Sequence, residues 1–463
     1  MSMTSVNSKI FKAYDIRGIY PEEINEGAAY QIGRAFALYL KKFESPMPEK
    51  IIVGQDARLS SQALSNSFKR GVTDEGVHVL DIGLVPVDVV YFASGSMKFP
   101  AAMVTASHNP KDWNGFKLIK SNVEFFNVLD LEIIIKNLPP KIPDVIKGEI
   151  KNENIKELYI KHVLSFIDIQ NIRPMRIAID TGNGAVGPIL KSILQKLPIE
   201  YIAMNFNPDG DFPNHEPDPS KEKNNIDLIN EINGGHYHFG CAFDGDGDRI
   251  IFIDEEGKPI NPSIIGAIIA KSFLKPRHYG KVVYSLDVSK IVPDVVNAYG
   301  GEPIRERVGH TYIKKRLKEV DGILGIENSG HYYFKNNFYV DSGIICFLIM
   351  IYILSGQKKS LQAISGEFSK YFSISDINFS TKGGSASGGK VENAEALIKK
   401  IAQNFEGYQI DWLDGLTITT SDFWFTIRSS NTEPLLRLNI EAKDEIILER
   451  VKKDLITLIK KDI

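Results

Sequence analysis

The chain has 463 residues, of which 43% are hydrophobic and 24% are charged. This composition is typical of soluble globular proteins, and the length predicts about three domains, within a range of two to four. The formal net charge of −3 provides no polybasic surface, so neither nucleic acid nor an anionic membrane is expected as a partner. The two cysteines, Cys241 and Cys346, are too few for a disulfide scaffold and are typical of the reducing cytoplasm.

No segment is expected to enter a membrane. Residues 1–12 lack the apolar core of a signal peptide. The most apolar run, 344–354, is shorter than the roughly 20 residues that span a bilayer. We interpret this run as a buried helix whose start is capped by Asp341 or Ser342.

The N-terminal part alternates strands and helices, as an α/β layer does. The apolar runs and turn residues predict strands at 10–17, 50–56, 77–82 and 101–104 and a helix at 60–75. The same order recurs twice, with strands at 176–180, 201–204, 237–243 and 250–253 around a helix at 188–197, and then at 281–287, 322–326 and 332–334. Asp56, Asp180 and Asp287 end corresponding strands. We therefore expect three diverged α/β domains, each presenting a polar loop between two strands.

The pattern changes after about residue 373. Residues 381–389 form a Gly/Ser-rich stretch that reads as flexible. Helices predicted at 392–404 and 443–460 flank strands at 424–427 and 435–440, with a fourth polar loop between those strands. This part predicts a smaller α+β domain.

The loop Thr105-Ala-Ser-His-Asn-Pro110 carries a hydroxyl and an imidazole, and Lys117 follows closely. Together these groups could attack, transfer a proton and hold an anion. Taken alone, the loop could equally be an ordinary turn.

The loop Asp244-Gly-Asp-Gly-Asp248 is the sharpest metal signal, because alternating carboxylates and glycines let one tight turn aim several oxygens at a hard cation. Glu255 occupies the twelfth position of a calcium-binding helix–loop–helix, but Arg249 stands where that motif needs glycine, and the flanks read as strands. With few protein ligands available, the expected ion is Mg²⁺ that shares a phosphate oxygen.

Other polar segments are less specific. Residues 182–187 match the dinucleotide fingerprint, but no acidic residue ends the next strand, so a strand-to-helix turn is favoured. Residues 428–432 have the composition of a phosphate cradle. Two histidines and a carboxylate at 307–310 and 327–331 suit sugar hydroxyls, although His310 alone would more often be structural.

Four segments together resemble the signatures of the α-D-phosphohexomutases, in family order and one per expected domain. They are Thr-Ala-Ser-His-Asn-Pro at 105–110, Asp-Gly-Asp-Gly-Asp-Arg at 244–249, Glu-Asn-Ser-Gly-His at 327–331 and Arg-Ser-Ser-Asn-Thr at 428–432. Residues 11–17, the segment Asp211-Phe-Pro-Asn-His215 and Asn431 are most similar to the phosphomannomutase/phosphoglucomutase branch. The phosphoglucosamine branch usually has glycine at the position of Asn431.

The resemblance implies a four-domain α/β fold with three similar mixed-sheet domains at 1–150, 151–255 and 256–370, a C-terminal α+β domain at 371–463, and a central cleft. It implies roles for these residues: catalysis by Ser107, His108, Lys117, Arg17 and Arg249; Mg²⁺ binding by Asp244, Asp246, Asp248 and phosphorylated Ser107; and substrate binding by Tyr14, Lys290, Gly309, His310, Glu327, Asn328, Ser329, Gly330, His331, Arg428, Ser429, Ser430, Asn431 and Thr432. The family's lysine just after Asp-Val is Ser289 here, with Lys290 one place later.

The implied activity is reversible phosphoryl transfer between C1 and C6 of a hexose phosphate, through phosphoserine and a hexose 1,6-bisphosphate, by a cytoplasmic isomerase that is expected to be a monomer. Two alternatives stay open at this point. One is a phosphoglucosamine mutase, and the other is a phosphosugar-binding protein without activity. Intact Ser107, His108 and Lys117 disfavour the latter, because a binding protein does not need a nucleophile.

Overall fold

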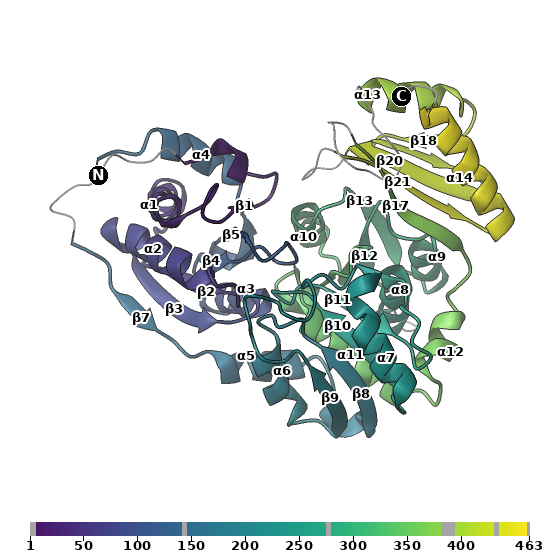
Figure 1. Ribbon diagram of the computed structural model, residues 1–463, viewed down its shortest axis with the longest axis horizontal. Helices are drawn as coiled ribbons and strands as arrows, with labels where there is room; N and C mark the ends of the chain where they lie inside the picture. The colour runs from purple at the N-terminus through teal and green to yellow at the C-terminus, as the bar shows by residue number, and fades with distance from the viewer. Residues whose placement is uncertain (1–5, 141–145, 275–278, 381–393, 430–434, 461–463) are drawn as a thin grey trace. The chain divides into compact units, whose positions relative to one another are not determined.

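Figure 1 shows a computed structural model of the chain, which describes residues 6–140, 146–274, 279–380, 394–429 and 435–460. The contacts divide the chain into two compact units. The first unit is Met1–Ile260 with Ser329–Ala363, and the second is Asn261–Asn328 with Ile364–Ile463. The Gly/Ser stretch at 381–389 lies outside the described residues.

The first sheet of the first unit has the order β1-β5-β4-β2-β3-β7, with β6 paired to β5. Strands β2, β3 and β4 are parallel, and β5 returns antiparallel to β4. Parallel strands are buried on both faces, which explains the unbroken apolar runs of β2 and β4. The elements of this part are η1 (Ser8–Ile10), β1 (Ile16–Ile19), α1 (Glu26–Phe43), β2 (Lys50–Gln55), α2 (Ser61–Asp74), β3 (His78–Leu84), α3 (Val87–Met97), β4 (Ala101–Val104), β5 (Trp113–Lys120), η2 (Ser121–Val123), β6 (Glu124–Phe125), α4 (Val128–Lys136) and β7 (Ile150–Asn152).

The second sheet of the first unit has the order β11-β10-β8-β9. Strand β10 is parallel to β8 and antiparallel to β11, so this sheet repeats the arrangement β5-β4-β2-β3. The predicted repeat is therefore confirmed for these two sheets, and the polar loops 105–110 and 244–249 follow corresponding strands. The elements are α5 (Lys156–Leu164), η3 (Ile169–Asn171), β8 (Met175–Asp180), α6 (Gly187–Leu194), β9 (Ile199–Met204), η4 (Glu222–Asn225), α7 (Ile226–Gly234), β10 (Phe239–Phe243) and β11 (Ile250–Ile253). Residues 182–187 connect β8 to α6, as predicted.

The predicted apolar helix is present in the first unit as α11 (Gly343–Ser355). Ser342 is its N-cap, and its side chain accepts the Ile345 N–H at 3.0 Å, which confirms one of the two proposed caps. Phe347 of this helix packs on Phe239 and Phe243. Strands β15 (Tyr332–Phe334) and β16 (Val340–Asp341), with η5 (Lys335–Asn337) between them, precede the helix. None of the described helices is long and apolar enough to cross a bilayer.

In the second unit, β12 lies between β13 and β14 and is parallel to both. The C-terminal antiparallel sheet has the order β17-β21-β20-β19-β18, and the apolar faces of α13 and α14 pack on it. The elements are α8 (Pro262–Phe273), β12 (Lys281–Ser285), α9 (Ile291–Ala298), β13 (Glu302–Glu306), α10 (His310–Glu319), β14 (Leu324–Ile326), β17 (Phe372–Ser380), α13 (Ala394–Gln403), β18 (Gln409–Asp411), β19 (Leu416–Thr419), β20 (Phe423–Ser429), β21 (Leu435–Ala442) and α14 (Glu445–Lys460). Helix α12 (Leu361–Gly366) spans the point at which the chain passes from one unit to the other.

One predicted strand begins later than expected, and the strands that were not predicted include β17. The strand predicted at 10–17 begins only at Ile16, because Lys12 N–H bonds to the Asp15 carbonyl and closes a turn before it. Strand β17 was not predicted; its residues alternate in polarity, but the pairing with β21 that makes it a strand is non-local. The domain boundaries at 150, 255 and 370 stay a prediction.

Candidate active site

Ser107 follows β4 in a backbone conformation that few side chains adopt. Its φ is +51°, in the left-handed region that non-glycine residues rarely occupy, and such strain gathers at functional sites. The side chain is buried, and its Oγ donates to Asp244 Oδ2 at 2.7 Å. His108 Nδ1 lies 3.1 Å from the same Oγ. Burial and the charges of Arg249 and Arg17 hold the pKa of His108 well below its usual range, so the imidazole is neutral and can accept a proton.

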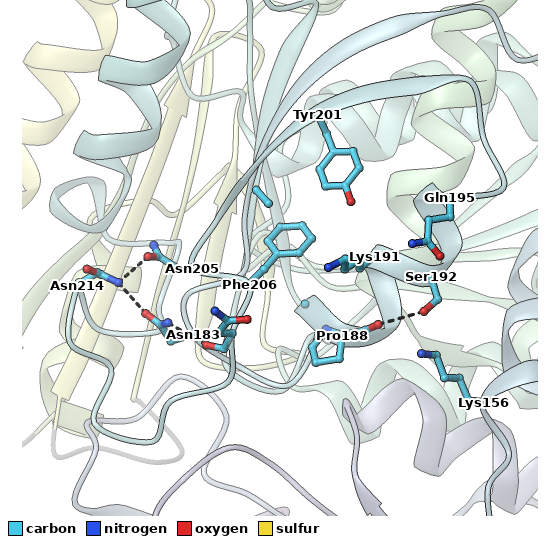
Figure 2. A pocket seen from close by; sticks show the side chains of 13 residues that line it. Lys156, Asn183, Pro188, Lys191, Ser192, Gln195, Tyr201, Asn205, Phe206 and Asn214 are labelled. Atoms are coloured by element: carbon cyan, nitrogen blue, oxygen red, sulfur yellow. Dashed lines mark hydrogen bonds between the residues drawn. The ribbon is translucent and has the colours of Figure 1, made fainter.

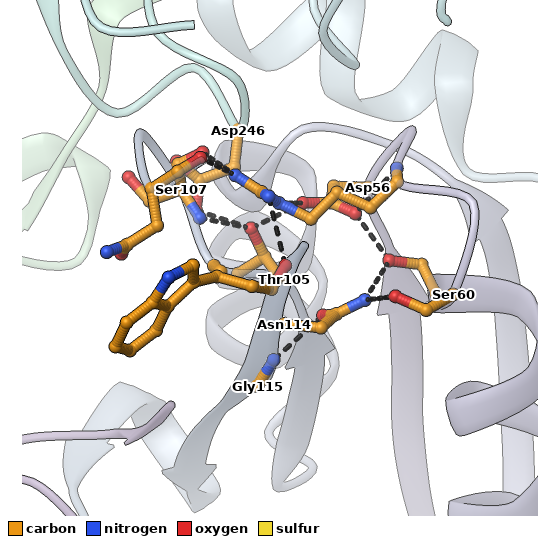
Figure 3. A network of polar contacts seen from close by, with 12 residues as sticks. Asp56, Ser60, Thr105, Ser107, Asn114, Gly115 and Asp246 are labelled. Carbon is orange, nitrogen blue, oxygen red and sulfur yellow. Dashed lines mark hydrogen bonds and ion pairs between the residues drawn. The ribbon is translucent and has the colours of Figure 1, made fainter. Parts of the chain in front are cut away.

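Arg58 and Asp56, whose role sequence reasoning missed, hold the serine loop through hydrogen bonds; Figure 3 shows Asp56 with Thr105 and Ser107. Arg58 donates to the carbonyl oxygens of Ser107 and Asn109 at 2.7 and 2.6 Å. Asp56 accepts from Arg58 Nε at 3.2 Å and from Thr105 Oγ1 at 2.8 Å. Thr105 Oγ1 in turn accepts the Ser107 N–H at 2.8 Å and lies 3.2 Å from Asp246 Oδ2. The sequence places Asp56 at the end of a predicted strand. The signal for its structural role was Arg58, a possible ion-pair partner two residues later.

The three aspartates of the β10–β11 loop converge as the sequence predicted. Ligand oxygens of Asp244, Asp246 and Asp248 lie within 4.8 Å of one another, and all three residues are buried. Asp244 Oδ1 accepts the backbone N–H groups of Gly247 and Arg249 at 2.9 and 3.2 Å, and this shapes the turn. Lys117 Nζ donates to Asp246 Oδ2 at 2.8 Å and to Asp248 Oδ2 at 2.6 Å.

The electrostatics of this loop favour a hard cation. Burial and the neighbouring carboxylates raise the pKa of Asp244 well above its ordinary value. Burial would also raise the pKa of Asp248, but Lys117 and His331 outweigh it and hold that pKa well below the usual range. Asp246 Oδ1 is buried with no hydrogen-bond partner among the described residues, which is costly unless a ligand satisfies it. Oxygen donors of this kind suit Mg²⁺.

The calcium-binding helix–loop–helix is excluded by the geometry. Strands β10 and β11 flank the loop, and Glu255 accepts the Gln362 N–H at 3.1 Å instead of joining the aspartates.

Cationic and imidazole groups surround the aspartates within the first unit. Arg17 pairs with Asp15 at 2.7 Å and donates to the Ala106 carbonyl at 3.3 Å. Arg249 has a buried Nε without a hydrogen-bond partner among the described residues, which fits an anionic ligand. His331 Nε2 lies 3.2 Å from Asp248 Oδ1, and its Nδ1 lies 2.7 Å from Ser329 Oγ. Two predicted substrate-binding residues also lie in this unit. The Gly330 carbonyl accepts the Ile250 N–H at 3.1 Å, and Tyr14 is half-buried.

The remaining predicted site residues belong to the second unit. Glu327 Oε1 accepts the Gly309 N–H at 3.0 Å, which joins two of the predicted substrate segments, and His310 begins α10. Asn328 Oδ1 accepts from Ser263 Oγ at 3.1 Å. The Lys290 N–H donates to Glu441 at 2.9 Å.

Arg428 and Ser429 end β20. Arg428 is only 5% exposed, and its buried Nε has no hydrogen-bond partner among the described residues. Ser430, Asn431 and Thr432 lie outside the described residues.

Comparison with known proteins agrees with this arrangement. Profiles of the phosphoglucomutase/phosphomannomutase α/β/α domains I, II and III match residues 8–136, 157–257 and 261–371, and the profile of the C-terminal domain matches 386–458. A phosphomannomutase of Methanocaldococcus jannaschii is 36% identical, covering 98% of each chain. One of Escherichia coli K12 is 33% identical, covering 97% of this chain and 98% of its own.

A solved phosphoglucomutase/phosphomannomutase family protein of Burkholderia thailandensis superposes with a TM-score of 0.88 at 28% identity, covering 99% of this chain and 98% of its own. The four domain profiles, the full-length relatives and the shared fold agree. The chain therefore belongs to the phosphoglucomutase/phosphomannomutase family, the α-D-phosphohexomutases.

Proposed function

We propose that this protein is a phosphomannomutase/phosphoglucomutase that moves a phosphoryl group reversibly between C1 and C6 of a hexose phosphate. The observation that carries the proposal is the contact of Ser107 Oγ with Asp244 and with neutral His108, at a residue whose own backbone is left-handed. Full-length relatives at 33% and 36% identity are phosphomannomutases. In enzyme classification this reaction belongs to the isomerases.

The reaction begins with phosphorylated Ser107. The free sugar hydroxyl attacks the phosphorus, the bond from phosphorus to Ser107 Oγ breaks, and a hexose 1,6-bisphosphate forms. The hydroxyl proton must pass to a neutral base, and His108 is suited to this because its pKa is held well below its usual range by burial and by Arg249. The bisphosphate then reorients so that its other phosphate faces Ser107. Transfer of that phosphate to Ser107 restores the phosphoserine and releases the product.

Asp244, Asp246 and Asp248, together with the phosphate on Ser107, would hold Mg²⁺. When bound, the ion neutralises charge on the transferring oxygens. Lys117, Arg17 and Arg249 add cationic groups around the same centre, where preorganised charge provides most of such catalysis.

Two further groups of residues are proposed to bind the substrate. Tyr14, Lys290, Gly309, His310, Glu327, Asn328, Ser329, Gly330 and His331 provide donors and acceptors for the sugar. Arg428, Ser429, Ser430, Asn431 and Thr432 would bind the phosphate that is not reacting. Support comes from the buried Nε of Arg428, which lacks a partner among the described residues. We further propose a cytoplasmic monomer.

The test combines mass spectrometry with a coupled assay. The purified protein should carry phosphate on Ser107, and it should interconvert the 1- and 6-phosphates of mannose and those of glucose. Ser107→Ala should fold but lose turnover, whereas Ser94→Ala, which removes another buried hydroxyl, should keep it. Activity within a few-fold of wild type in Ser107→Ala would refute the carrier. Faster turnover of glucosamine 1-phosphate would indicate a phosphoglucosamine mutase, and sugar-phosphate binding without turnover a binding protein.

A further inference from the structure

Buried Asp180 and partly buried His215 form an ion pair close to the metal-binding loop. His215 Nε2 lies 2.9 Å from Asp180 Oδ2, and His215 Nδ1 lies 2.8 Å from the Glu216 carbonyl oxygen. A neutral imidazole has one N–H, so both contacts are hydrogen bonds only when the ring is protonated. Burial alone would lower the pKa of His215, but the hydrogen bond and charge of Asp180 outweigh it and raise that pKa. The pair is therefore a charged one.

Asp180 also organises the two backbone segments beside it. Its Oδ1 accepts the Gly182 N–H at 2.7 Å, at the start of the turn into α6. Both of its oxygens accept from Asn205 Nδ2, at 3.0 and 3.1 Å. Figure 2 shows Asn214 bridging Asn183 and Asn205, with contacts of 2.9 and 2.5 Å. The segment after β8 and the segment around His215 are thus tied to one carboxylate.

Both of these segments bond to the backbone of Gly245 in the metal-binding loop. The Gly245 carbonyl accepts the Ala185 N–H at 3.0 Å, and the Gly245 N–H donates to the Pro217 carbonyl at 3.3 Å. The fit leaves no room for a side chain, since a Cβ on Gly184 would lie 2.5 Å from the Gly245 carbonyl oxygen. Gly245 lies between Asp244 and Asp246, so its position sets the direction of both carboxylates.

We infer that Asp180 and His215 are positioning residues: they fix the two segments that hold the backbone of Gly245, and thereby preorganise the metal-binding aspartates. The inference rests on the proposed Mg²⁺ site. The parallel with the first sheet supports it, because Asp56 directly follows β2 and Asp180 ends β8, the corresponding strand of the second sheet. Asp56 pairs with Arg58, which donates to carbonyl oxygens of the serine loop. Asp180 pairs with His215, whose segment reaches the metal-binding loop through the Pro217 carbonyl. The sequence segment around Asp211 and His215 thereby gains a role outside direct substrate contact.

The primary experiment measures Mn²⁺ binding by calorimetry in the absence of substrate. His215→Ala should weaken binding about 10-fold or more, the usual effect of removing a residue that orients metal ligands. His215→Gln should restore part of this loss, because its amide can donate to Asp180. Since the two residues act as a pair, Asp180→Ala combined with His215→Ala should weaken binding no more than Asp180→Ala alone.

Two controls separate positioning from general destabilisation. His162→Ala removes another partly buried, hydrogen-bonded histidine of the same unit, which contacts Asn337 at 2.9 Å; it should lower the melting temperature without changing Mn²⁺ affinity. Hydrogen exchange of the peptide at 244–249 should quicken in His215→Ala, while the strand at 50–55 stays protected.

The outcomes distinguish this inference from the function it rests on. If Asp246→Asn abolishes Mn²⁺ binding and His215→Ala leaves it within two-fold, the positioning role is refuted and the metal site stands. If Asp246→Asn leaves binding unchanged, the metal site itself is wrong, and the positioning role fails with it. Equal losses of affinity in His215→Ala and His162→Ala would also overturn the inference.

Discussion

Lys117 is the cation on which the aspartate loop most depends when no metal is bound. Its Nζ contacts Asp246 and Asp248 at 2.8 and 2.6 Å, and its side chain is only 6% exposed. Removing one partner of a buried pair costs about 3–5 kcal/mol, because the remaining charges stay buried without compensation. We therefore expect Lys117→Met to lower the free energy of unfolding by about this amount in EDTA. At a denaturant slope of about 3 kcal/mol/M, the urea midpoint should fall by about 1–1.7 M.

Lys111→Met is the matched control. Lys111 pairs with Asp211 at 3.2 Å, but both side chains are more than half exposed, and such pairs contribute about 0.2–1 kcal/mol. Urea unfolding of both variants is compared in EDTA and in Mg²⁺. Magnesium should stabilise Lys117→Met more than wild type, because in the variant no lysine neutralises the negative charges of the carboxylates that bind the ion. Equal midpoint shifts for the two variants in EDTA would refute the reasoning, as would a Mg²⁺ effect smaller in Lys117→Met than in wild type.

Three further predictions concern other cations of the protein. Arg428→Ala should lower kcat/KM about 10- to 150-fold with mannose 1-phosphate and with mannose 6-phosphate alike, because the lost hydrogen bonds to the phosphate contribute about 1.5–3 kcal/mol. A loss below two-fold in both directions would remove Arg428 from the site. Arg58→Lys keeps the charge but cannot reproduce the fork that holds the serine loop, so kcat should fall at least several-fold with little change in Mn²⁺ affinity, and unchanged kcat would contradict the role given to the fork. Burial lowers the pKa of His215, but Asp180 and the charge of Asp227 outweigh burial and raise that pKa. For His162, burial lowers the pKa. The stabilisation by His215 is therefore fully present below about pH 6.5 and is lost as pH rises through its folded pKa, whereas the stabilisation by His162 is lost as pH falls. The loss of melting temperature in His215→Ala should shrink as pH rises from 5.5 to 9, and the loss in His162→Ala should grow. Parallel trends in the two variants would contradict the charged pair.

The sequence by itself determined the fold class, the order of the repeats and the main chemical groups. Apolar runs that end in polar loops are local signals, because a strand buried on both faces must be apolar along its length. The alternation of aspartate and glycine at 244–248 was likewise readable, since it specifies both a tight turn and its charge. Ser342 was one of the two caps predicted for α11, because capping is a contact within one turn of helix.

Only the tertiary structure decided which residues hold these loops in place. Arg58 reaches the carbonyl of Ser107, 49 residues away, and Thr105 reaches Asp246 across 141 residues. His215 meets Asp180 across 35 residues, although nothing in the sequence near either residue names the other as its partner. Strand β17 was missed for the same reason, because it owes its conformation to pairing with β21. Local patterns specify which groups a loop carries, whereas their orientation depends on packing between segments that are distant in the chain.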